Sequence, residues 1–294
     1  MGKSVGIVIV NYNGAKYQND CIRTLYESTF TDFDIIVVDS ASIDNSIELL
    51  KQKFPDVTVL SQLENVGVAK GNNIGIRYCL KKCYKYIILM NNDIEIDRNM
   101  LERLMYYADE KTIVVPKIYY YKPNDLLWYA GGELDWNIAS SYHIGINQKD
   151  NGQFDILKKV TYAPTCCMVI PVGLFEDIGM IDEKYFMYFD DTDLCARISM
   201  SEKFKILYVP EAKMWHKVSS STGGQGSKIK IYYITRNHLY YMNKFSDNLL
   251  PLTKLKVNSR AYVKYLLSFV WRKNNRVIKK AYKDYSKGQM EILK

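Results

Sequence analysis

Four short apolar runs recur within the first hundred residues, and each leads through polar residues toward a helical pattern. The runs cover residues 5–10, 34–39, 57–60 and 86–90. Runs of this length are typical of strands buried on both faces, and helices are expected over residues 17–28, from the loop at 40–46 to about 54, and from Asn65 onward. Strands that alternate with helices pair in parallel through right-handed crossovers. The sequence therefore predicts an α/β fold whose first hundred residues form a nucleotide-binding half.

The fourth apolar run ends in Asn91-Asn92-Asp93. Side chains at the carboxyl end of such a strand point into the crevice where open α/β sheets hold ligands. The carboxylate of Asp93 could hold a divalent cation there, together with a substrate phosphate. The alternative is an ordinary solvated loop with a capping aspartate, and this stretch alone does not decide between the two.

A second polar cluster, Asp190-Asp191-Thr192-Asp193, follows an aromatic run at an expected helix start. Acidic residues favour helix N-termini, so a well-capped first turn is one explanation. Three close carboxylates also repel one another, which costs stability unless a cation or a function offsets it. The cluster therefore favours a functional site.

Periodicity weakens over residues 118–160, where we expect short strands and a mobile loop over the site. Strand patterns return over residues 160–171 and 206–209, and a Gly/Ser-rich loop is expected at 219–226. From residue 228 onward the pattern is helical, which divides the chain into residues 1–227 and a helical part, residues 228–294.

Charge is unevenly distributed along the chain. Residues 201–294 carry 20 Lys and Arg against 5 Asp and Glu, whereas the rest of the chain carries 20 against 27. Over residues 252–270 the apolar side chains share one helical face and the basic ones lie elsewhere, which predicts a basic amphipathic helix. Such a helix could pack on the body of the protein or lie shallowly on an anionic membrane surface.

Several classes of protein are disfavoured by the sequence. No uninterrupted apolar run approaches the roughly 20 residues of a membrane span, and no signal peptide is recognised. The six cysteines show neither paired Cys-x-x-Cys spacing nor a disulfide framework, so a reducing cytoplasm is expected. No nucleic-acid-binding motif accompanies the basic charge, and we expect no nucleic-acid partner.

Eight motifs, spread from residue 4 to about 240, occur in a characteristic order. They are residues 7–13, 37–44, 65–73, 89–93, 178–183, 188–194, 215–217 and 236–237. Together they resemble the family-2 glycosyltransferases with the GT-A fold, especially the branch that includes bacterial rhamnosyltransferases of polysaccharide assembly. The resemblance implies a mostly parallel central sheet flanked by helices, with a Rossmann-like nucleotide-binding half (1–117), an acceptor half (118–227) and C-terminal helices.

The resemblance also implies roles on the donor side of the site. Asp39 matches the acid that reads the nucleotide base, and the loop of Asn11, Tyr12 and Asn13 would line that pocket. Further contacts with the nucleotide sugar are expected from Ser42, Asn65, Gly71, Asn72, Asn91 and Asn92.

On the catalytic side, the resemblance makes Asp93 a ligand of a Mg²⁺ or Mn²⁺ ion that bridges the diphosphate, with His216 completing that site. Asp191 matches the catalytic base, and Asp190 beside it replaces the usual glutamate. Asn91 stands where other branches carry aspartate, so the metal is expected to bind weakly without the nucleotide. Further contacts on the acceptor or diphosphate side are expected from Asp193, Trp215, Lys217 and Arg236.

The predicted function is inverting, metal-dependent transfer of a sugar from a nucleotide diphosphate donor, dTDP-rhamnose or a UDP-hexose. The acceptor would be a hydroxyl of a glycan or a lipid-linked acceptor in surface polysaccharide synthesis, at the cytoplasmic face of the cell membrane. Two other functions stay open: a non-catalytic nucleotide-sugar or glycan-binding module, and a sugar nucleotidyltransferase. A binding module has no need of both Asp93 and the acidic cluster, and residues 11–16 are a poor version of the glycine-rich loop of nucleotidyltransferases.

Overall fold

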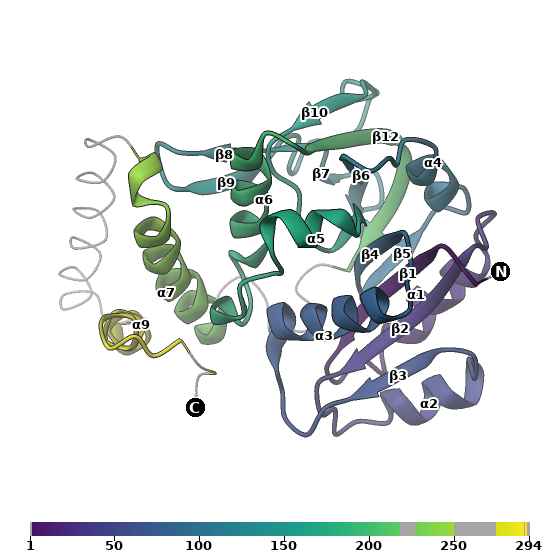
Figure 1. Cartoon of the computed structure of the whole chain (residues 1–294), viewed down its shortest axis with the longest axis horizontal. Helices are drawn as coiled ribbons and strands as arrows, with labels where there is room; N and C mark the ends of the chain where they lie inside the picture. Colours follow the sequence, from purple (N-terminus) through teal and green to yellow (C-terminus); the bar gives the residue numbers. More distant parts are fainter. Residues whose placement is uncertain (1, 218–226, 250–274, 291, 293–294) are drawn as a thin grey trace.

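The computed structural model describes residues 2–217, 227–249, 275–290 and 292, and its centre is one β-sheet with helices on both faces (Figure 1). Within these residues the sheet has ten strands. The main order is β10 (Lys158–Val160), β12 (Lys205–His216), β6 (Thr112–Tyr120), β11 (Cys167–Pro171), β4 (Tyr86–Asn91), β1 (Val5–Asn11), β2 (Phe33–Asp39) and β3 (Thr58–Ser61). In addition, β5 (Ile94–Ile96) pairs with β12 and β7 (Leu127–Tyr129) pairs with β6.

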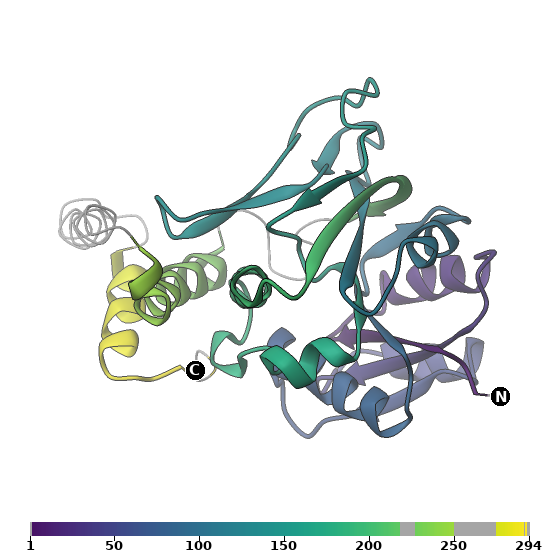
Figure 2. The ribbon, with the colours of Figure 1, turned by 45° about the horizontal axis from the view of Figure 1, so that its top comes forward.

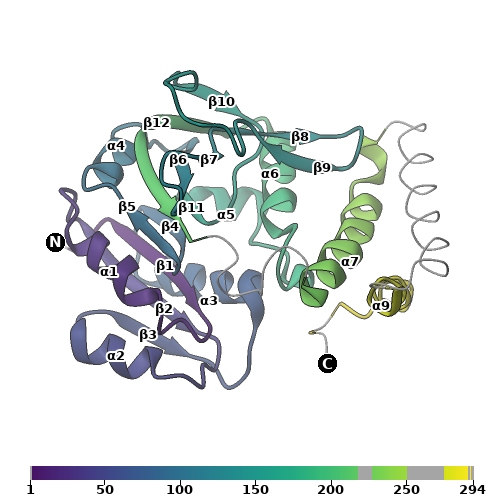
Figure 3. The same cartoon turned by 180° about the vertical axis from the view of Figure 1, so that it is seen from behind.

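The N-terminal half, which the sequence predicts to bind a nucleotide, is the parallel part of the sheet. Strands β3, β2, β1 and β4 are neighbours in that order, and all three pairings are parallel. The connecting helices are α1 (Gln18–Tyr26), α2 (Ser46–Lys53) and α3 (Gly67–Lys81). Views from opposite sides place α3 on one face of this sheet and α1 and α2 on the other (Figures 1 and 3). The predicted α/β half is confirmed, because each of its strands and helices lies within about two residues of the expected place.

Strand β11 makes the sheet mixed. It lies between β4 and β6 and runs antiparallel to both, whereas β6 and β12 pair in parallel. All five residues of β11 are buried. A continuous apolar run indicates burial on both faces but not the direction of the strand. The α/β architecture is as predicted, with a mixed sheet where a mostly parallel one was expected.

The region of weak periodicity forms regular structure. Besides β7 and β10 it contains the hairpin of β8 (Gly132–Asp135) and β9 (Ser140–His143), a separate two-stranded sheet. The single strand expected over residues 160–171 is wrong, because β10 ends at Val160 and β11 begins at Cys167. Pro164 lies between them and has no backbone N–H for a sheet hydrogen bond, which favours a break there.

The remaining helices follow β5 in the chain. They are α4 (Met100–Tyr106), α5 (Gly173–Ile178), α6 (Asp190–Ser201), α7 (Lys228–Lys244) and α9 (Asn275–Ser286), with short 3-10 turns η1 (Glu183–Tyr185) and η2 (Ser246–Asn248). Helix α7 and the tip of the β8–β9 hairpin lie side by side (Figure 2). There His238 Nε2 lies 3.0 Å from the carbonyl oxygen of Ile138. A second hydrophobic core is formed where α7 meets α6, η1 and the hairpin.

Two earlier predictions fall on segments that the structure does not describe. The basic amphipathic helix at 252–270 and the Gly/Ser-rich loop at 219–226 both lie outside the described residues. Among the helices that are described, none combines the length and the apolar character that a membrane crossing requires.

Glycines bring α3 directly against β1. A Cβ added to Gly71 would lie 2.8 Å from a methyl carbon of Val10, and one added to Gly75 would lie 2.2 Å from a methyl carbon of Val8. Both distances are shorter than real side chains show, so these two positions require glycine for close packing. This contact fixes the N-terminus of α3 beside the carboxyl end of β1.

Candidate active site

The carboxyl ends of β1 and β2 carry a hydrogen-bonded cluster of polar side chains. Nδ2 of Asn11 lies 3.0 Å from Oδ1 of Asp39 and 3.1 Å from Oγ of Ser42. Ser42 donates its hydroxyl to Oδ1 of Asp39 at 2.6 Å and its backbone N–H to Oδ2 at 3.2 Å. These three donors leave the carboxylate of Asp39 with about one of its four acceptor sites. A ligand N–H group could occupy that site.

The loop after β1 joins this cluster to the end of β4. Asn13 accepts a hydrogen bond from the backbone N–H of Ile43 at 2.9 Å, and Asn92 donates to Oδ1 of Asn11 at 2.9 Å. A Cβ at Gly14 would lie 2.1 Å from Oδ1 of Asn11, so the loop can approach this closely only with glycine. The ring of Tyr12 is exposed. The structure thus brings Asn11, Asn13, Asp39, Ser42 and Asn92 together, as the sequence predicted.

Asp93 and His216 meet at the end of β4. The pairing of β12 with β5 aligns His216 with Ile94, and the backbone N–H of Lys217 donates to the carbonyl oxygen of Asp93 at 2.9 Å. The side chains follow, with Nε2 of His216 3.1 Å from Oδ1 of Asp93 and 3.4 Å from Nδ2 of Asn91. Both Asp93 and His216 are buried, at 6% and 7% exposure.

This pair has the chemistry of a divalent metal site. The carboxylate of Asp93 is a hard oxygen ligand, and Nε2 of His216, the ring nitrogen that faces it, is of a type that binds divalent metals. Across the described residues, no group of three or more His, Cys, Asp or Glu side chains could hold a metal ion by itself. Two protein ligands would leave most of the coordination positions of Mg²⁺ or Mn²⁺ to substrate oxygens and water.

The residues on either side of His216 face other surroundings. Trp215 points to the opposite face of β12, where its ring stacks on Tyr119 and its Nε1 donates to the carbonyl oxygen of Asn124. The ammonium of Lys217 lies 2.7 Å from Glu95 and 3.1 Å from Asp20. Lys217 therefore lies beside Asp93, whereas Trp215 lies on the opposite face of β12, away from Asp93 and His216.

The acidic cluster begins helix α6, and its first member is a buried carboxyl group. Asp190 is 4% exposed, and its Oδ2 is without a hydrogen-bond partner. Burial, and after it the neighbouring Asp191 carboxylate, raises the pKa of Asp190 to about 8. Burial and the neighbouring carboxylate thus favour the neutral form of Asp190.

Asp191 has a more polar environment. Its Oδ2 accepts a hydrogen bond from the hydroxyl of Tyr162 at 2.8 Å, and its Oδ1 accepts from the backbone N–H of Thr192 at 2.7 Å. Burial raises the pKa of Asp191, while the hydrogen bonds from Tyr162 and Thr192 act in the opposite direction. Two adjacent carboxyl groups with different surroundings are typical of sites where one is neutral and the other is ionised.

The segment before these acids has a strained backbone that is held from outside. Phe186, Tyr188 and Phe189 all have φ between 60° and 68°, in the left-handed region that non-glycine residues rarely adopt. Nδ2 of Asn237, on α7, lies 2.7 to 2.9 Å from the carbonyl oxygens of Tyr185, Met187 and Tyr188.

Helix α3 supports the same segment from the other side. The carbonyl oxygen of Phe186 accepts the backbone N–H of Val68 at 2.7 Å. Gly67 has φ +75° there, and a Cβ on it would lie 2.6 Å from that oxygen. We call residues 185–189 the clamped loop, because α7 and α3 hold it on two sides and thereby set the start of α6.

Two predicted contact residues are part of this support and have no exposed surface. Asp193 is fully buried, with Oδ1 2.7 Å from Nε of Arg197 and Oδ2 2.6 Å from Nζ of Lys244. Arg236 is also fully buried, and its guanidinium donates to the carbonyl oxygens of Lys184 and Tyr185. The structure therefore places both away from any position where they could touch an acceptor.

Helix α3 carries three further residues predicted to bind the nucleotide sugar. Oδ1 of Asn65 accepts the backbone N–H of Gly67 at 3.0 Å at the start of the helix. Gly71 packs against β1, and Asn72 is 4% exposed. These positions shape the helix start beside the polar cluster, but no hydrogen bond joins them to Asn11 or Asp39 in the described structure.

Asp93, of the metal-side pair, and Asp191, of the acidic cluster, both lie near the thiol of Cys166. Burial raises the pKa of Cys166, with Cys167 next in importance, and the carboxylates of Asp93 and Asp191 raise it further. Both acids are thus close enough to act on the same group. The backbone also connects them, since the N–H of Asn91 donates to the carbonyl oxygen of Cys166 at 3.0 Å.

A row of aromatic and imidazole rings joins the same two places. The ring of Tyr162 stacks on His143 with a centroid distance of 5.6 Å. Trp128 then meets His143 edge to face at 4.5 Å and His216 at 4.7 Å. The row therefore runs from the hydrogen-bond partner of Asp191 to that of Asp93.

Sequence reasoning missed four residues of this site: Trp128, His143, Tyr162 and Asn237. The density of aromatic residues near 119–129 and the scarcity of histidine were weak signals for Trp128 and His143. Asn237 lies beside Arg236 in a matched motif, and its role could have been weighed there. Nothing in the pattern around Tyr162 singled it out.

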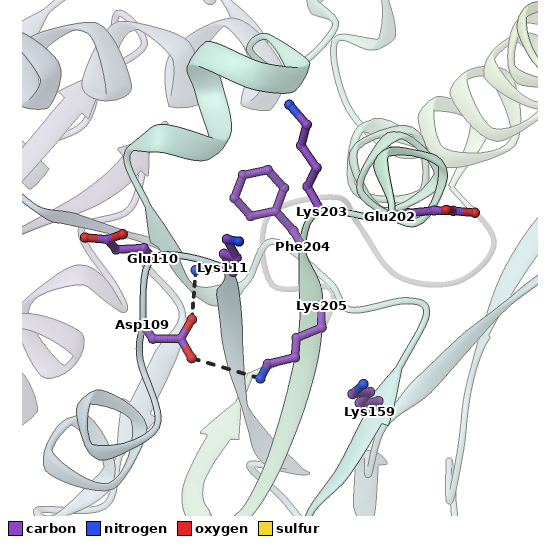
Figure 4. A pocket seen from close by; sticks show the side chains of 8 residues that line it. All are labelled: Asp109, Glu110, Lys111, Lys159, Glu202, Lys203, Phe204 and Lys205. Carbon is purple, nitrogen blue, oxygen red and sulfur yellow. Dashed lines mark hydrogen bonds and ion pairs between the residues drawn. The ribbon is translucent and has the colours of Figure 1, made fainter.

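A charged hollow of about 610 Å³ lies at the other end of the sheet (Figure 4). It is open to solvent and surrounds the beginnings of β6 and β12, whereas Tyr120 and His216 mark the ends of these strands. Its lining residues are Asp109, Glu110, Lys111, Lys159, Glu202, Lys203, Phe204 and Lys205. None of them belongs to the site described above.

Comparison with known proteins finds similarity to glycosyltransferases. The family model described as "Glycosyl transferase family 2" matches residues 6–179. The low-salt glycan biosynthesis hexosyltransferase Agl10 of Haloferax volcanii is 30% identical over 66% of this chain, which spans 61% of that protein's length. The dTDP-rhamnosyl transferase RfbF of Shigella flexneri is 26% identical over 83% of this chain and 80% of its own length.

Solved structures show the same fold. GalNAc-T7, crystallised with UDP, GalNAc and Mn²⁺, superposes with a TM-score of 0.62 over 82% of this chain and 48% of its own, at 15% identity. The mannosyltransferase PcManGT from Pyrobaculum calidifontis, in complex with GDP-Man and Mn²⁺, gives a TM-score of 0.58 over 100% of this chain and 77% of its own, at 14% identity. Both neighbours are GT-A glycosyltransferases, so the predicted fold is confirmed.

Proposed function

Since this chain belongs to glycosyl transferase family 2, we propose that its site moves a sugar from a nucleotide diphosphate donor to an acceptor hydroxyl with inversion at the anomeric carbon. The observation that carries the proposal is the row of packed rings that joins Tyr162, the hydrogen-bond partner of Asp191, to His216, the partner of Asp93. One acid stands beside a histidine with an unpartnered nitrogen, and the other is a hydrogen-bonded carboxylate. The first pair suits a metal ion that assists departure of the leaving group, and the second carboxylate suits a general base.

The donor would lie across the ends of β1, β2 and β4. The free acceptor site of Asp39 suits a base N–H, and the Asn11 to Asn13 loop would line the same pocket. Asp93 and His216 would hold Mg²⁺ or Mn²⁺, which when bound stabilises negative charge on the departing diphosphate. Lys217 adds a positive charge beside them.

Asp191 would take the proton from the acceptor hydroxyl as that hydroxyl attacks the anomeric carbon. The electron pair of the sugar–phosphate bond leaves with the nucleoside diphosphate, so a single displacement inverts the configuration, as single-step glycosidases do. Asp190 is the less suitable base, because its Oδ2 is buried without a hydrogen-bond partner and burial favours its neutral form, whereas Asp191 accepts hydrogen bonds from Tyr162 and Thr192.

The relatives suggest which sugars to test. One relative is named a dTDP-rhamnosyl transferase and another a hexosyltransferase of glycan biosynthesis, so dTDP-rhamnose and UDP-hexoses are the proposed donors. The proposed acceptor is a hydroxyl of a growing surface glycan, free or linked to a lipid.

A donor-binding experiment tests the proposal directly. We expect one nucleotide sugar to raise the melting temperature in the presence of Mn²⁺ and to be slowly hydrolysed to nucleoside diphosphate. Asp39→Asn should weaken donor binding by roughly 10- to 100-fold, because it removes a charged hydrogen-bond acceptor from the pocket. The exposed Asp56→Asn is the control and should bind like the wild type.

The outcomes separate the candidate functions. A donor that binds but is neither hydrolysed nor transferred would identify a binding module. Absence of binding for every nucleotide sugar would contradict the proposal as a whole. Formation of a nucleotide sugar from a sugar phosphate and a nucleoside triphosphate would identify a nucleotidyltransferase.

We further propose that helix α9 places the acceptor half on an anionic membrane surface. Its basic residues recur at helical spacing on one side, and they are Arg276, Lys279, Lys280, Lys283 and, just after the helix, Lys287. The adjacent face packs on α7, where Ala281 is fully buried, and Asp284 accepts the hydroxyl of Tyr232 at 2.6 Å and pairs with Lys280 at 3.3 Å. A cationic face held in one orientation suits anionic lipid headgroups.

Vesicle binding checks this second part. The chain should bind vesicles of anionic phosphatidylglycerol and not those of neutral phosphatidylcholine. The triple change of Arg276, Lys280 and Lys283 to glutamate should abolish binding, since each basic residue near an anionic surface contributes about 1 kcal/mol. Glutamate at the exposed Lys51, Lys53 and Lys82 of the nucleotide-binding half is the matched control. Equal loss in both variants would show that net charge, and not the α9 face, determines binding.

A further inference from the structure

Tyr162 reaches Asp191 from a distant part of the chain. It lies between β10 and β11, 29 residues before Asp191, and its hydroxyl donates to Oδ2 at 2.8 Å. Only 5% of its surface is exposed. A buried phenol that donates to a carboxylate on another element contributes both a fixed position and an electrostatic effect.

The ring of Tyr162 is held in one orientation from several sides. One face stacks on His143 with an interplanar angle of 28°. A Cβ on Gly132 would lie 2.7 Å from a ring carbon of Tyr162, so the ring fills the space that a side chain there would take. The backbone is held as well, since Tyr129 donates its hydroxyl to the carbonyl oxygen of Tyr162 at 2.9 Å.

The hydrogen bonds of Asp191 leave little freedom for its carboxylate. Thr192 donates its backbone N–H at 2.7 Å and its hydroxyl at 3.2 Å to Oδ1, and Tyr162 donates to Oδ2. These three donors occupy three of the about four acceptor sites that a carboxylate offers. The remaining site belongs to Oδ2, the oxygen that Tyr162 holds.

We propose that Tyr162 is a positioning residue for the base Asp191, and that it fixes Oδ2 so that its last acceptor site is available to the acceptor hydroxyl. This inference rests on the proposed function of Asp191. In this proposal Tyr162 does not contact the substrate, and it acts through the carboxylate of Asp191, which does.

The hydrogen bond also favours the ionised form of the base. Among the described residues, the titratable groups acting on Asp191 are Asp190 and Cys195 on α6, and Tyr162 and Cys166 before β11. Burial raises the pKa of Asp191, and the phenol of Tyr162 opposes this rise. A base must be ionised to accept a proton, so loss of the phenol raises the pKa and moves the acidic limb of the pH–rate profile to higher pH.

Tyr162→Phe tests the inference, because it keeps the ring and removes only the hydroxyl. We expect kcat to fall roughly 10- to 100-fold and the acidic limb to move up by about one to two pH units, as for the loss of a hydrogen bond to a charged group. The KM for the donor should be unchanged, since Tyr162 does not contact Asp39 or Asp93. Tyr84→Phe is the matched control: it removes a buried phenol that donates to another carboxylate, Asp34, at 2.7 Å and leaves the donors of Asp191 in place, so its pH profile should be that of the wild type.

A second measurement does not depend on turnover. The carboxyl carbon of Asp191, assigned by comparing ¹³C-aspartate-labelled wild type with Asp191→Asn, should titrate at higher pH in Tyr162→Phe than in the wild type. An unchanged titration together with an unchanged acidic limb would overturn the proposal, even if Asp191→Asn is inactive. A wild type that neither binds nor transfers any sugar would instead overturn the proposed function, and the two failures are therefore distinguishable.

Discussion

Asp191→Asn should abolish sugar transfer while it leaves donor binding nearly intact. The amide has almost the shape of the carboxylate but cannot take a proton from the acceptor hydroxyl. General-base catalysis is worth roughly 10²- to 10⁴-fold, so the remaining rate should be lower than that of the wild type by about this factor. The measurement is initial velocity with a saturating donor and acceptor, alongside the dissociation constant of the nucleoside diphosphate.

The control for this variant is a similar change outside the site. Asp125→Asn removes an exposed carboxylate of the acceptor half that pairs with Lys149, and it should leave the rate unchanged. If Asp191→Asn kept wild-type velocity, the base would have to be another group. If it lost donor binding as well, the effect would be on folding, and the melting temperature of the variant would show this.

Asp93→Ala should raise the metal requirement of the reaction by at least about 100-fold. Changes in groups that merely support metal ligands cost 10- to 100-fold in affinity, and Asp93 is the only carboxylate in the proposed ligand pair. The measurement is binding of Mn²⁺ in the presence of nucleoside diphosphate, followed by paramagnetic resonance without turnover. Velocity against Mn²⁺ concentration gives the second readout.

Asn91→Asp is the opposite change and sharpens the test. Nδ2 of Asn91 lies 3.4 Å from the imidazole of His216, so a carboxylate there would add a hard ligand to the same place. We expect tighter metal binding, with the largest gain in the absence of nucleotide. An unchanged metal titration in both Asp93→Ala and Asn91→Asp would move the ion to another site.

The nucleotide-binding half was predictable because its signals are local. Each strand is a continuous apolar run, and polar residues such as Asp39 and Asn92 follow strands whose carboxyl ends meet at one edge of the sheet. The meeting of Asp93 with His216 was suggested by motif order alone. Its structural cause is the pairing of β12 with β5, two strands far apart in the sequence, and no local pattern indicates such a pairing.

The acidic cluster shows a different limit. In the sequence, Asp190, Asp191 and Asp193 form one group, but successive residues of a helix point about 100° apart. One carboxyl group is therefore buried without a partner at Oδ2, the next accepts a bond from Tyr162, and the third forms ion pairs in the core. The surroundings of each aspartate depend on how α6 packs against α7 and the β11 side of the sheet. The sequence of the motif alone does not determine this packing.

The clamped loop also sets an order in which the enzyme can become competent as the chain emerges from the ribosome. Asn237 follows Tyr185 by 52 residues, so the acids of α6 are synthesised well before the side chain that holds the loop in front of them. The polar cluster around Asp39, by contrast, uses only residues 11–92 and can form early. A nascent chain should thus acquire the proposed donor pocket first and the proposed base, Asp191, last, once α7 has docked.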